Sequence, residues 1–344
     1  MSSSGVRSVK YDDLIRLQEK GEDSPFLAAR LQFQESAALL NQHIRPMVGK
    51  RRVFPTMVIP QASGRVGISD PPVGNFTADP MYGPRGLRDV VRPNPGTTWV
   101  CADWSAVEGW IVSHRCQDPV DLEAKSRGLD LHTVTAIRMF KYPDPPFEPT
   151  DENLASSGGI SWCQEVGFRK EIRDGVKNTR YTMQYAKNPA AVRRYAVKLG
   201  LQPNKLEQFG RLYLQSKPQL RLWKEKIWED VWRRREARTA FGRRRRFAGD
   251  PLYGTPEWHK YKAKVEKEGL NHEVQGTVAD MMKITQVSLN MIGCRMVLQR
   301  HDGWYSEVPE GWDRMSEYKA IVEREWTIDG RPFTCPAEYE VIRG

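Results

Sequence analysis

The chain has little cysteine, and the few cysteines present do not form a recognisable site. Five occur among 344 residues, at scattered positions and in an odd number. There is no Cys-x-x-Cys pair and no histidine–cysteine spacing typical of zinc ligands. The sequence therefore argues against both a structural zinc site and a disulfide framework.

Long apolar runs are also missing. No stretch approaches the roughly 18 apolar residues that a membrane-spanning helix needs. The first ten residues, MSSSGVRSVK, lack the apolar segment of a secretory signal. We therefore expect a soluble, cytoplasmic protein with no membrane partner.

Acidic residues are outnumbered by basic ones. Lysine and arginine total 53 and aspartate and glutamate 43, which gives a net charge of +10 and a pI near 9.3. Two arginine runs, 233–235 and 243–246, are interleaved with Trp228, Trp232 and Phe247. Such runs are usually solvated faces, but aromatic residues among them favour a groove for a polyanion such as nucleic acid.

The chain contains segments typical of strands and segments typical of helices. Residues 97–115 predict a strand followed by a turn into a helix. Long helical segments are expected at about 165–187, 204–238 and 257–291, and a hairpin is expected around residues 301–303. At 344 residues, two or three subdomains are expected.

One stripe of side chains carries the strongest functional signal. Arg173, Lys177, Tyr181 and Tyr185 are spaced by four within EIRDGVKNTRYTMQYAKNP. Positions four apart share one face of an α-helix, so this face presents two cations and then two aromatic rings. Cations suit a triphosphate, and aromatic rings suit a sugar and a base.

Two acids follow apolar runs that are typical of strands. Asp103 ends the run Trp99–Asp103, and Asp302 follows the run that begins at Met296. An aspartate after a strand is usually a turn or helix cap, so neither residue is informative alone. Together with the cationic and aromatic stripe, paired carboxylates indicate metal-assisted nucleotidyl transfer, because Mg²⁺ prefers oxygen ligands.

Three segments resemble the motifs of family A DNA polymerases. DWSAVEGW resembles motif A, RDGVKNTRYTMQYA resembles motif B, and QRHDGWYSE resembles motif C. Four further segments also match the family, and all seven occur in the family's order between residues 62 and 307: ASGRVGISDPP, LDLHTVTA, TAFGRRRRF and NHEVQGTVADMMK.

The resemblance implies a role for each matching residue. Asp103, Asp302 and the backbone carbonyl of Trp104 match the ligands of two Mg²⁺ ions. Glu108 matches the residue that excludes a ribose 2′-hydroxyl. Arg173 and Lys177 match the triphosphate contacts, of which Lys177 also counts as catalytic.

The remaining matches concern the base and the DNA. Tyr181 matches the aromatic residue beside the incoming sugar and base, and Tyr185 the tyrosine beside the templating position. Primer, template or minor-groove contacts are implied for a larger group: Arg65, Arg243, Asn271, Gln275 and His301.

Motif C departs from the family pattern. Gly303 stands where the family usually has glutamate, so one acid near the metal ligands is missing. Glu307, four positions later, matches an acid that the family often keeps. We expect these changes to affect rate and fidelity more than the type of reaction.

The resemblance implies an α+β right-hand fold with an antiparallel-sheet palm, helical fingers and a shortened helical thumb. The expected divisions are a thumb at 1–62, palm at 63–120 and 248–344, and fingers at 121–247. The implied partners are primer–template DNA and dNTPs. The chain resembles divergent, phage-like members, and we expect no exonuclease domain, so that an accessory protein could supply processivity or proofreading.

Two alternatives remain open from the sequence. A single-subunit RNA polymerase shares the palm and a related motif B, although Glu108 and the QGTVAD segment argue against it. A weakly active, polymerase-derived nucleic-acid-binding subunit would be compatible with Gly303 and the short thumb, although Asp103 and Asp302 oppose it.

Overall fold

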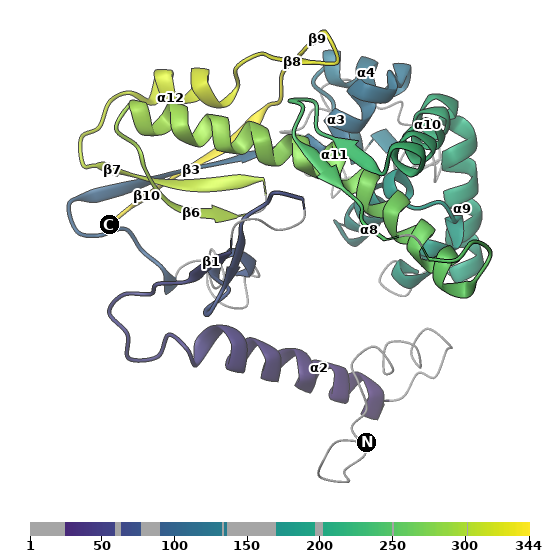
Figure 1. Cartoon of the computed structure of the whole chain (residues 1–344). Helices are drawn as coiled ribbons and strands as arrows, with labels where there is room; N and C mark the ends of the chain where they lie inside the picture. The colour runs from purple at the N-terminus through teal and green to yellow at the C-terminus, as the bar shows by residue number, and fades with distance from the viewer. Residues whose placement is uncertain are drawn as a thin grey trace, which may run out of the picture.

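The computed structural model describes residues 25–58, 63–76, 90–132, 134–135, 170–196, 202–249, 251–300 and 302–344. Within these ranges the chain combines a central sheet with helices that flank it and extend away from it (Figure 1). All strand pairs are antiparallel, which confirms the predicted α+β class.

The central sheet has four strands in the order β10-β3-β7-β6. The strands are β3 (Thr97–Trp104), β6 (Arg295–Arg300), β7 (Gly303–Pro309) and β10 (Ala337–Arg343). The strand predicted from residue 97 and the hairpin predicted near residue 302 are both confirmed. They are direct neighbours, although about 200 residues of sequence separate them.

The two faces of this sheet have different surroundings. Val100, Ala102 and Trp104 point into the main core beneath α11 (Pro256–Met291) and α12 (Met315–Val322). There the Trp104 indole donates a hydrogen bond of 3.0 Å to the carbonyl of Val322. Because side chains alternate along a strand, Asp103 lies on the opposite face, where only a smaller apolar cluster forms.

A helical region lies beside the sheet on the right in Figure 1. Its helices are α3 (Val107–Cys116), α4 (Pro119–Ser126), α8 (Lys170–Tyr185), α9 (Pro203–Ser216) and α10 (Pro218–Arg234). The single helix predicted over 204–238 is wrong. The chain breaks at Lys217, because Pro218 disfavours helical backbone at the preceding residue and starts a new helix.

Smaller elements complete the described chain. The helix α2 (Pro25–Leu39) continues into a turn of π-helix, Leu40–Ile44, and lies below the sheet in Figure 1. Short hairpins are formed by β1 (Thr56–Val58) with β2 (Gly67–Ser69), β4 (Glu236–Arg238) with β5 (Arg244–Arg246), and β8 (Trp326–Ile328) with β9 (Arg331–Phe333). Short 3₁₀ helices cover Val73–Asn75 and Pro189–Tyr195.

Among the described helices, none is long and apolar enough to cross a membrane.

Candidate active site

The two predicted acids meet at one end of the sheet. Asp103, near the end of β3, pairs with Gly303, the first residue of β7, so Asp302 stands directly beside it. The backbone amide of Trp104 donates to the Asp302 carbonyl at 3.2 Å, which ties the two strand ends together. Residues 199 positions apart are therefore brought together by strand register.

Three carboxylates lie close together at this end of the sheet, those of Asp103, Asp302 and Glu108. Burial, together with the neighbouring charges of Glu108 and Asp103, raises the pKa of Asp302 to about 7, although Arg65 acts in the opposite direction. Arg65 donates to an Asp302 oxygen at 2.6 Å and also bonds Glu108. The Arg65 guanidinium is thus shared between the carboxylates of Asp302 and Glu108.

Glu108 is the centre of a hydrogen-bond network at the floor of the site. It lies in the first turn of α3 and is 8% exposed. The Tyr185 hydroxyl donates to it at 2.5 Å, and the Gln275 amide donates at 3.5 Å. These donors, with Arg65, fix the carboxylate, and burial beside Glu108 raises the pKa of Tyr185 so that its hydroxyl stays protonated.

The helix α8 forms a wall of the same site. Lys177, Tyr181 and Tyr185 line a cleft of about 1080 Å³ together with both aspartates. The centres of the Tyr181 and His132 rings are 5.6 Å apart. Burial raises the pKa of the Tyr181 hydroxyl. Arg173 belongs to α8, but its side chain lies outside the described residues.

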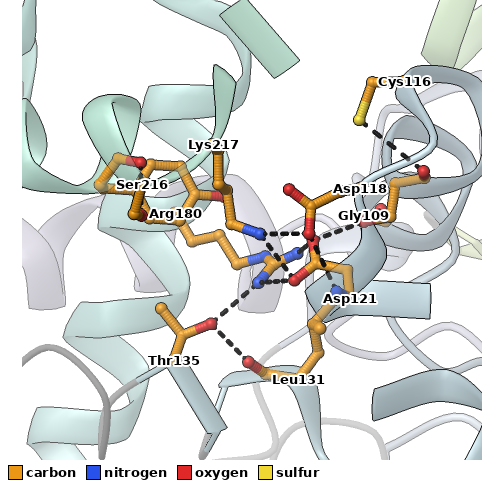
Figure 2. A network of polar contacts seen from close by, with 11 residues as sticks. Gly109, Cys116, Asp118, Asp121, Leu131, Thr135, Arg180, Ser216 and Lys217 are labelled. Atoms are coloured by element: carbon orange, nitrogen blue, oxygen red, sulfur yellow. Dashed lines mark hydrogen bonds and ion pairs between the residues drawn. The ribbon is translucent and has the colours of Figure 1, made fainter. Parts of the chain in front are cut away.

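The back face of α8 is held by buried ion pairs (Figure 2). Arg180 is 1% exposed and donates to Asp121 of α4 at 2.5 Å and to the Thr135 hydroxyl at 2.8 Å. Lys217, at the break between α9 and α10, donates to Asp118 and Asp121 at 2.9 and 2.8 Å. Charged groups this deeply buried need such partners, so the network fixes α8 against α4.

The last turn of α8 is capped from α10. Lys224 is 2% exposed and donates to the carbonyls of Met183 and Ala186 at 2.7 and 2.6 Å. A cation at a helix C-terminus also complements the helix dipole. Burial lowers the pKa of Lys224 to about 7. Nothing in the sequence distinguishes this lysine from its neighbours on α10.

The residues predicted to contact DNA have different surroundings. Arg65, Asn271 and Gln275 line the cleft. Arg243 instead braces the protein: it donates to Asp280 at 2.6 Å, to the Ser63 carbonyl at 2.9 Å and to the Gly276 carbonyl at 3.0 Å. His301 lies outside the described residues.

The departure at Gly303 has a steric explanation. A Cβ at this position would lie 2.7 Å from the Ala102 carbonyl oxygen and 3.0 Å from the Asp103 carboxyl carbon. The strands therefore approach too closely here for any side chain. Glu307 lies further along β7, where it is 7% exposed and accepts from Asn94 at 2.9 Å and Trp99 at 3.4 Å. It supports the sheet rather than the carboxylate pair.

The donor set suits a divalent cation on chemical grounds. Two neighbouring carboxylates are hard oxygen ligands, and the raised pKa of Asp302 shows that nearby positive charge would be stabilising. Within the described ranges, no three histidine, cysteine, aspartate or glutamate residues are grouped as metal ligands. A bound Mg²⁺ would therefore need further oxygens from the backbone, water or a phosphate.

Several cleft residues were not predicted from the sequence. They follow α8 or lie on the facing turns of α11: Lys187, Asn188, Arg194, Tyr195, Ala263, Glu266 and Lys267. Lys187 pairs with Glu266 at 2.5 Å and lies 4.5 Å from the centre of the Trp228 ring. Only the helical periodicity of α11, read from Asn271 backwards, could have indicated Lys267 and Ala263.

Known proteins are similar to this chain in sequence. The family model described as DNA polymerase family A matches residues 2–342. The thermostable DNA polymerase I of Thermus filiformis is 28% identical over 92% of this chain and 35% of its own length. The thermostable DNA polymerase I of Thermus thermophilus is 27% identical over 99% of this chain and 38% of its own length. The chain thus spans little more than a third of these relatives.

A solved structure shows the same fold. The POL domain of Pol1 from M. smegmatis, solved in complex with DNA primer-template and dNTP, aligns with a TM-score of 0.73 at 22% identity. The alignment covers 98% of this chain and 56% of that one. Since the family model extends over nearly the whole sequence, the chain belongs to DNA polymerase family A.

Proposed function

We propose that this chain is a DNA-directed DNA polymerase that adds dNTPs to a primer 3′-hydroxyl. One observation carries the proposal: a single cleft contains the Asp103–Asp302 pair, the buried Glu108 and the Lys177–Tyr181–Tyr185 face of α8. Family membership supports it, as do relatives whose names describe DNA polymerases.

Different side chains would contact different parts of the nucleotide. Lys177 is an exposed cation at the rim of the cleft and suits the triphosphate, where charge grows as pyrophosphate leaves. Arg173, one turn earlier on α8, would serve the same phosphates. The rings of Tyr181 and Tyr185 would pack against the sugar and the base pair.

Asp103, Asp302 and the Trp104 carbonyl would hold two Mg²⁺ ions, which would supply charge stabilisation for phosphoryl transfer. In the reaction, a bond forms between the primer O3′ and the α-phosphorus of the dNTP. The O3′–H bond breaks and its proton passes to water, the bond from that phosphorus to the pyrophosphate oxygen breaks, and pyrophosphate leaves. The protein's contribution is to align these groups and to neutralise charge through Lys177.

The proposed subdomains group most of the elements, although the boundary after residue 120 falls within α4. The palm, 63–120 and 248–344, contains all four strands of the central sheet. The fingers, 121–247, contain α8, α9 and α10. The segment 1–62 would be a shortened thumb. Primer–template DNA would lie against Arg65, Asn271 and Gln275 in the cleft, with His301 and Arg243 nearby. The absence of an exonuclease and the role of an accessory protein stay predictions.

Glu108 would select deoxyribose. Its carboxylate is fixed by Tyr185 and Arg65, so it would not move away from a ribose 2′-hydroxyl. The test is primer extension with competing dNTP and NTP. The wild type should extend with dNTP, and Glu108→Ala should raise the relative use of NTP by at least about tenfold.

Glu123→Gln, on the exposed surface of α4, is a suitable control and should not change sugar preference. Extension by the wild type with NTP in preference to dNTP would favour an RNA polymerase instead. No extension with either nucleotide would leave a nucleic-acid-binding subunit as the better description.

A further inference from the structure

An aromatic cluster with adjacent cations lies beyond the far end of the cleft. We define it as Trp232, Tyr253, Trp258 and Tyr261, with the cations Arg235 and Lys262. The Trp232 and Trp258 rings meet edge to face with their centres 5.5 Å apart, and the centres of the Tyr253 and Trp258 rings are 4.8 Å apart. The Arg235 guanidinium lies 3.6 Å from the centre of the Trp232 ring.

The cluster continues the active-site cleft along two packed helices. The cleft ends at Trp228 of α10 and at Ala263 and Glu266 of α11. Trp232 lies one turn beyond Trp228, and Lys262 lies one turn beyond Glu266 on the same helix face. A strand leaving the cleft along these helices would therefore meet the cluster next.

The rings are partly open to solvent, and cations lie beside them. Tyr253 is 81% exposed, and Trp232, Trp258 and Tyr261 are each half-buried. Lys262 lies 5.6 and 5.2 Å from the Trp232 and Trp258 rings. Two of the nearby acids are engaged in ion pairs, Asp230 with Arg233 and Glu236 with Arg238, while Glu229 and Glu257 also lie on these two helices.

We propose that this aromatic cluster binds the single-stranded template before it reaches the active site. The inference rests on the proposed polymerase function and adds a second template-binding site to it. Aromatic rings stack on any base, and cations follow the phosphates, so this combination suits single-stranded DNA without sequence preference.

The position of the cluster sets a length requirement on the template. Gln275, beside the carboxylates, and Trp258 are 17 residues apart on the continuous helix α11, which corresponds to about 25 Å. At about 3.4 Å per nucleotide along one strand, an overhang of about eight nucleotides would reach the cluster. An overhang of two nucleotides would not.

The test is equilibrium binding of primer–templates that carry either a two-nucleotide or a twelve-nucleotide 5′ overhang. The proteins are the wild type, Trp258→Leu, which keeps apolar volume without an aromatic ring, and Trp258→Phe, which keeps a ring. Lys262→Ala is compared with Lys319→Ala as a control. Lys319, on α12, also lies over an aromatic ring, that of Tyr339, but outside the cluster.

Trp258→Leu should weaken binding of the long overhang by roughly 5- to 20-fold, with the short overhang changed less than about twofold. Trp258→Phe should retain most of the affinity, and Lys262→Ala should lose more than Lys319→Ala. Equal losses on both overhangs, or no loss on the long one, would overturn the inference.

Extension of the two-nucleotide overhang keeps this test separate from the proposed function. Loss of that extension by the wild type would count against the polymerase assignment. Normal extension with no effect of overhang length would count only against the aromatic cluster as a template site.

Discussion

At the residue scale, Gly303 shows how a departure from a motif can have a structural cause. The sequence marks it as a missing acid, whereas the structure shows two strands too close for a side chain. We predict that Gly303→Ala separates β3 from β7, destabilises the fold by about 1–3 kcal/mol and lowers extension at least tenfold. Thermal unfolding and single-nucleotide extension rates would measure both effects.

Gly109→Ala provides the comparison for this substitution. A Cβ at Gly109 would meet Leu131 at 3.6 Å and Gln184 at 3.8 Å, which are ordinary contacts. It should be tolerated. If the two variants behaved alike, the close approach of the strands would not explain the glycine at position 303.

Asp302 provides a prediction about pH and metal. Its pKa is raised in the folded protein to about 7, so between about pH 4 and pH 7 the folded state binds more protons than the unfolded state. Without metal, the extra proton on Asp302 therefore stabilises the folded state at low pH. This part of the free energy of unfolding is lost as the pH rises to about 7. Mg²⁺ competes with the proton, so its stabilising effect on the melting temperature should be larger at pH 8 than at pH 6.

Asp302→Asn removes the titrating group and should remove most of this difference. The measurement is the melting temperature with and without Mg²⁺ at both pH values. An equal shift at pH 6 and pH 8 in the wild type would show that Asp302 does not compete with protons for the metal.

Many residues of the site were predictable from the sequence, but the hydrogen bonds between them were not. The acids Asp103 and Asp302 and the stripe Lys177–Tyr185 follow from apolar runs and helical spacing, and the structure places them in one cleft. The bond from Tyr185 to Glu108 joins segments 77 residues apart. Lys224 likewise becomes a cap only after α10 has packed against α8, and no local pattern encodes that packing.

At the scale of elements, the position of α8 depends on its buried back face. Asp121→Asn would leave Arg180 buried without a full countercharge, so we predict a loss of about 3–5 kcal/mol in stability. Because α8 carries Lys177 and Tyr181, the variant should also raise the KM for dNTP at temperatures where it stays folded. Chemical denaturation and steady-state kinetics would measure these effects.

The double variant Arg180→Met with Asp121→Leu separates charge from position. Replacing both partners by apolar groups should recover much of the stability, because the Arg180 and Asp121 charges are both removed while Lys217 keeps Asp118 as a partner. A double variant no more stable than Asp121→Asn would contradict the account of this network.

Elements with strong local signals were predicted well. Residues 256–291 form one helix, and the strand–turn–helix at 97–115 is confirmed. The predicted helix 204–238 failed at Pro218, where a proline starts a second helix. The strand β10 was not predicted, because its place beside β3 depends on pairing across more than 230 residues.

At the scale of the whole molecule, the excess of basic residues concerns binding rather than the fold. With a net charge of +10, the chain should hold DNA mainly through phosphates. We predict that affinity for primer–template falls at least tenfold between about 50 and 200 mM salt, which a titration at several salt concentrations would show. Nearly constant affinity would indicate a grip through shape and apolar contacts.

We propose that the carboxylate pair where β3 meets β7 supports nucleotidyl transfer by this chain. Extension of a labelled primer on a longer template, with dNTPs and Mg²⁺, tests it most directly in the wild type, Asp103→Asn and Asp302→Asn. We expect the wild type to extend to the template end and both variants to lose extension while binding primer–template nearly as well. Extension retained by either variant, or lost only together with DNA binding, would contradict the account.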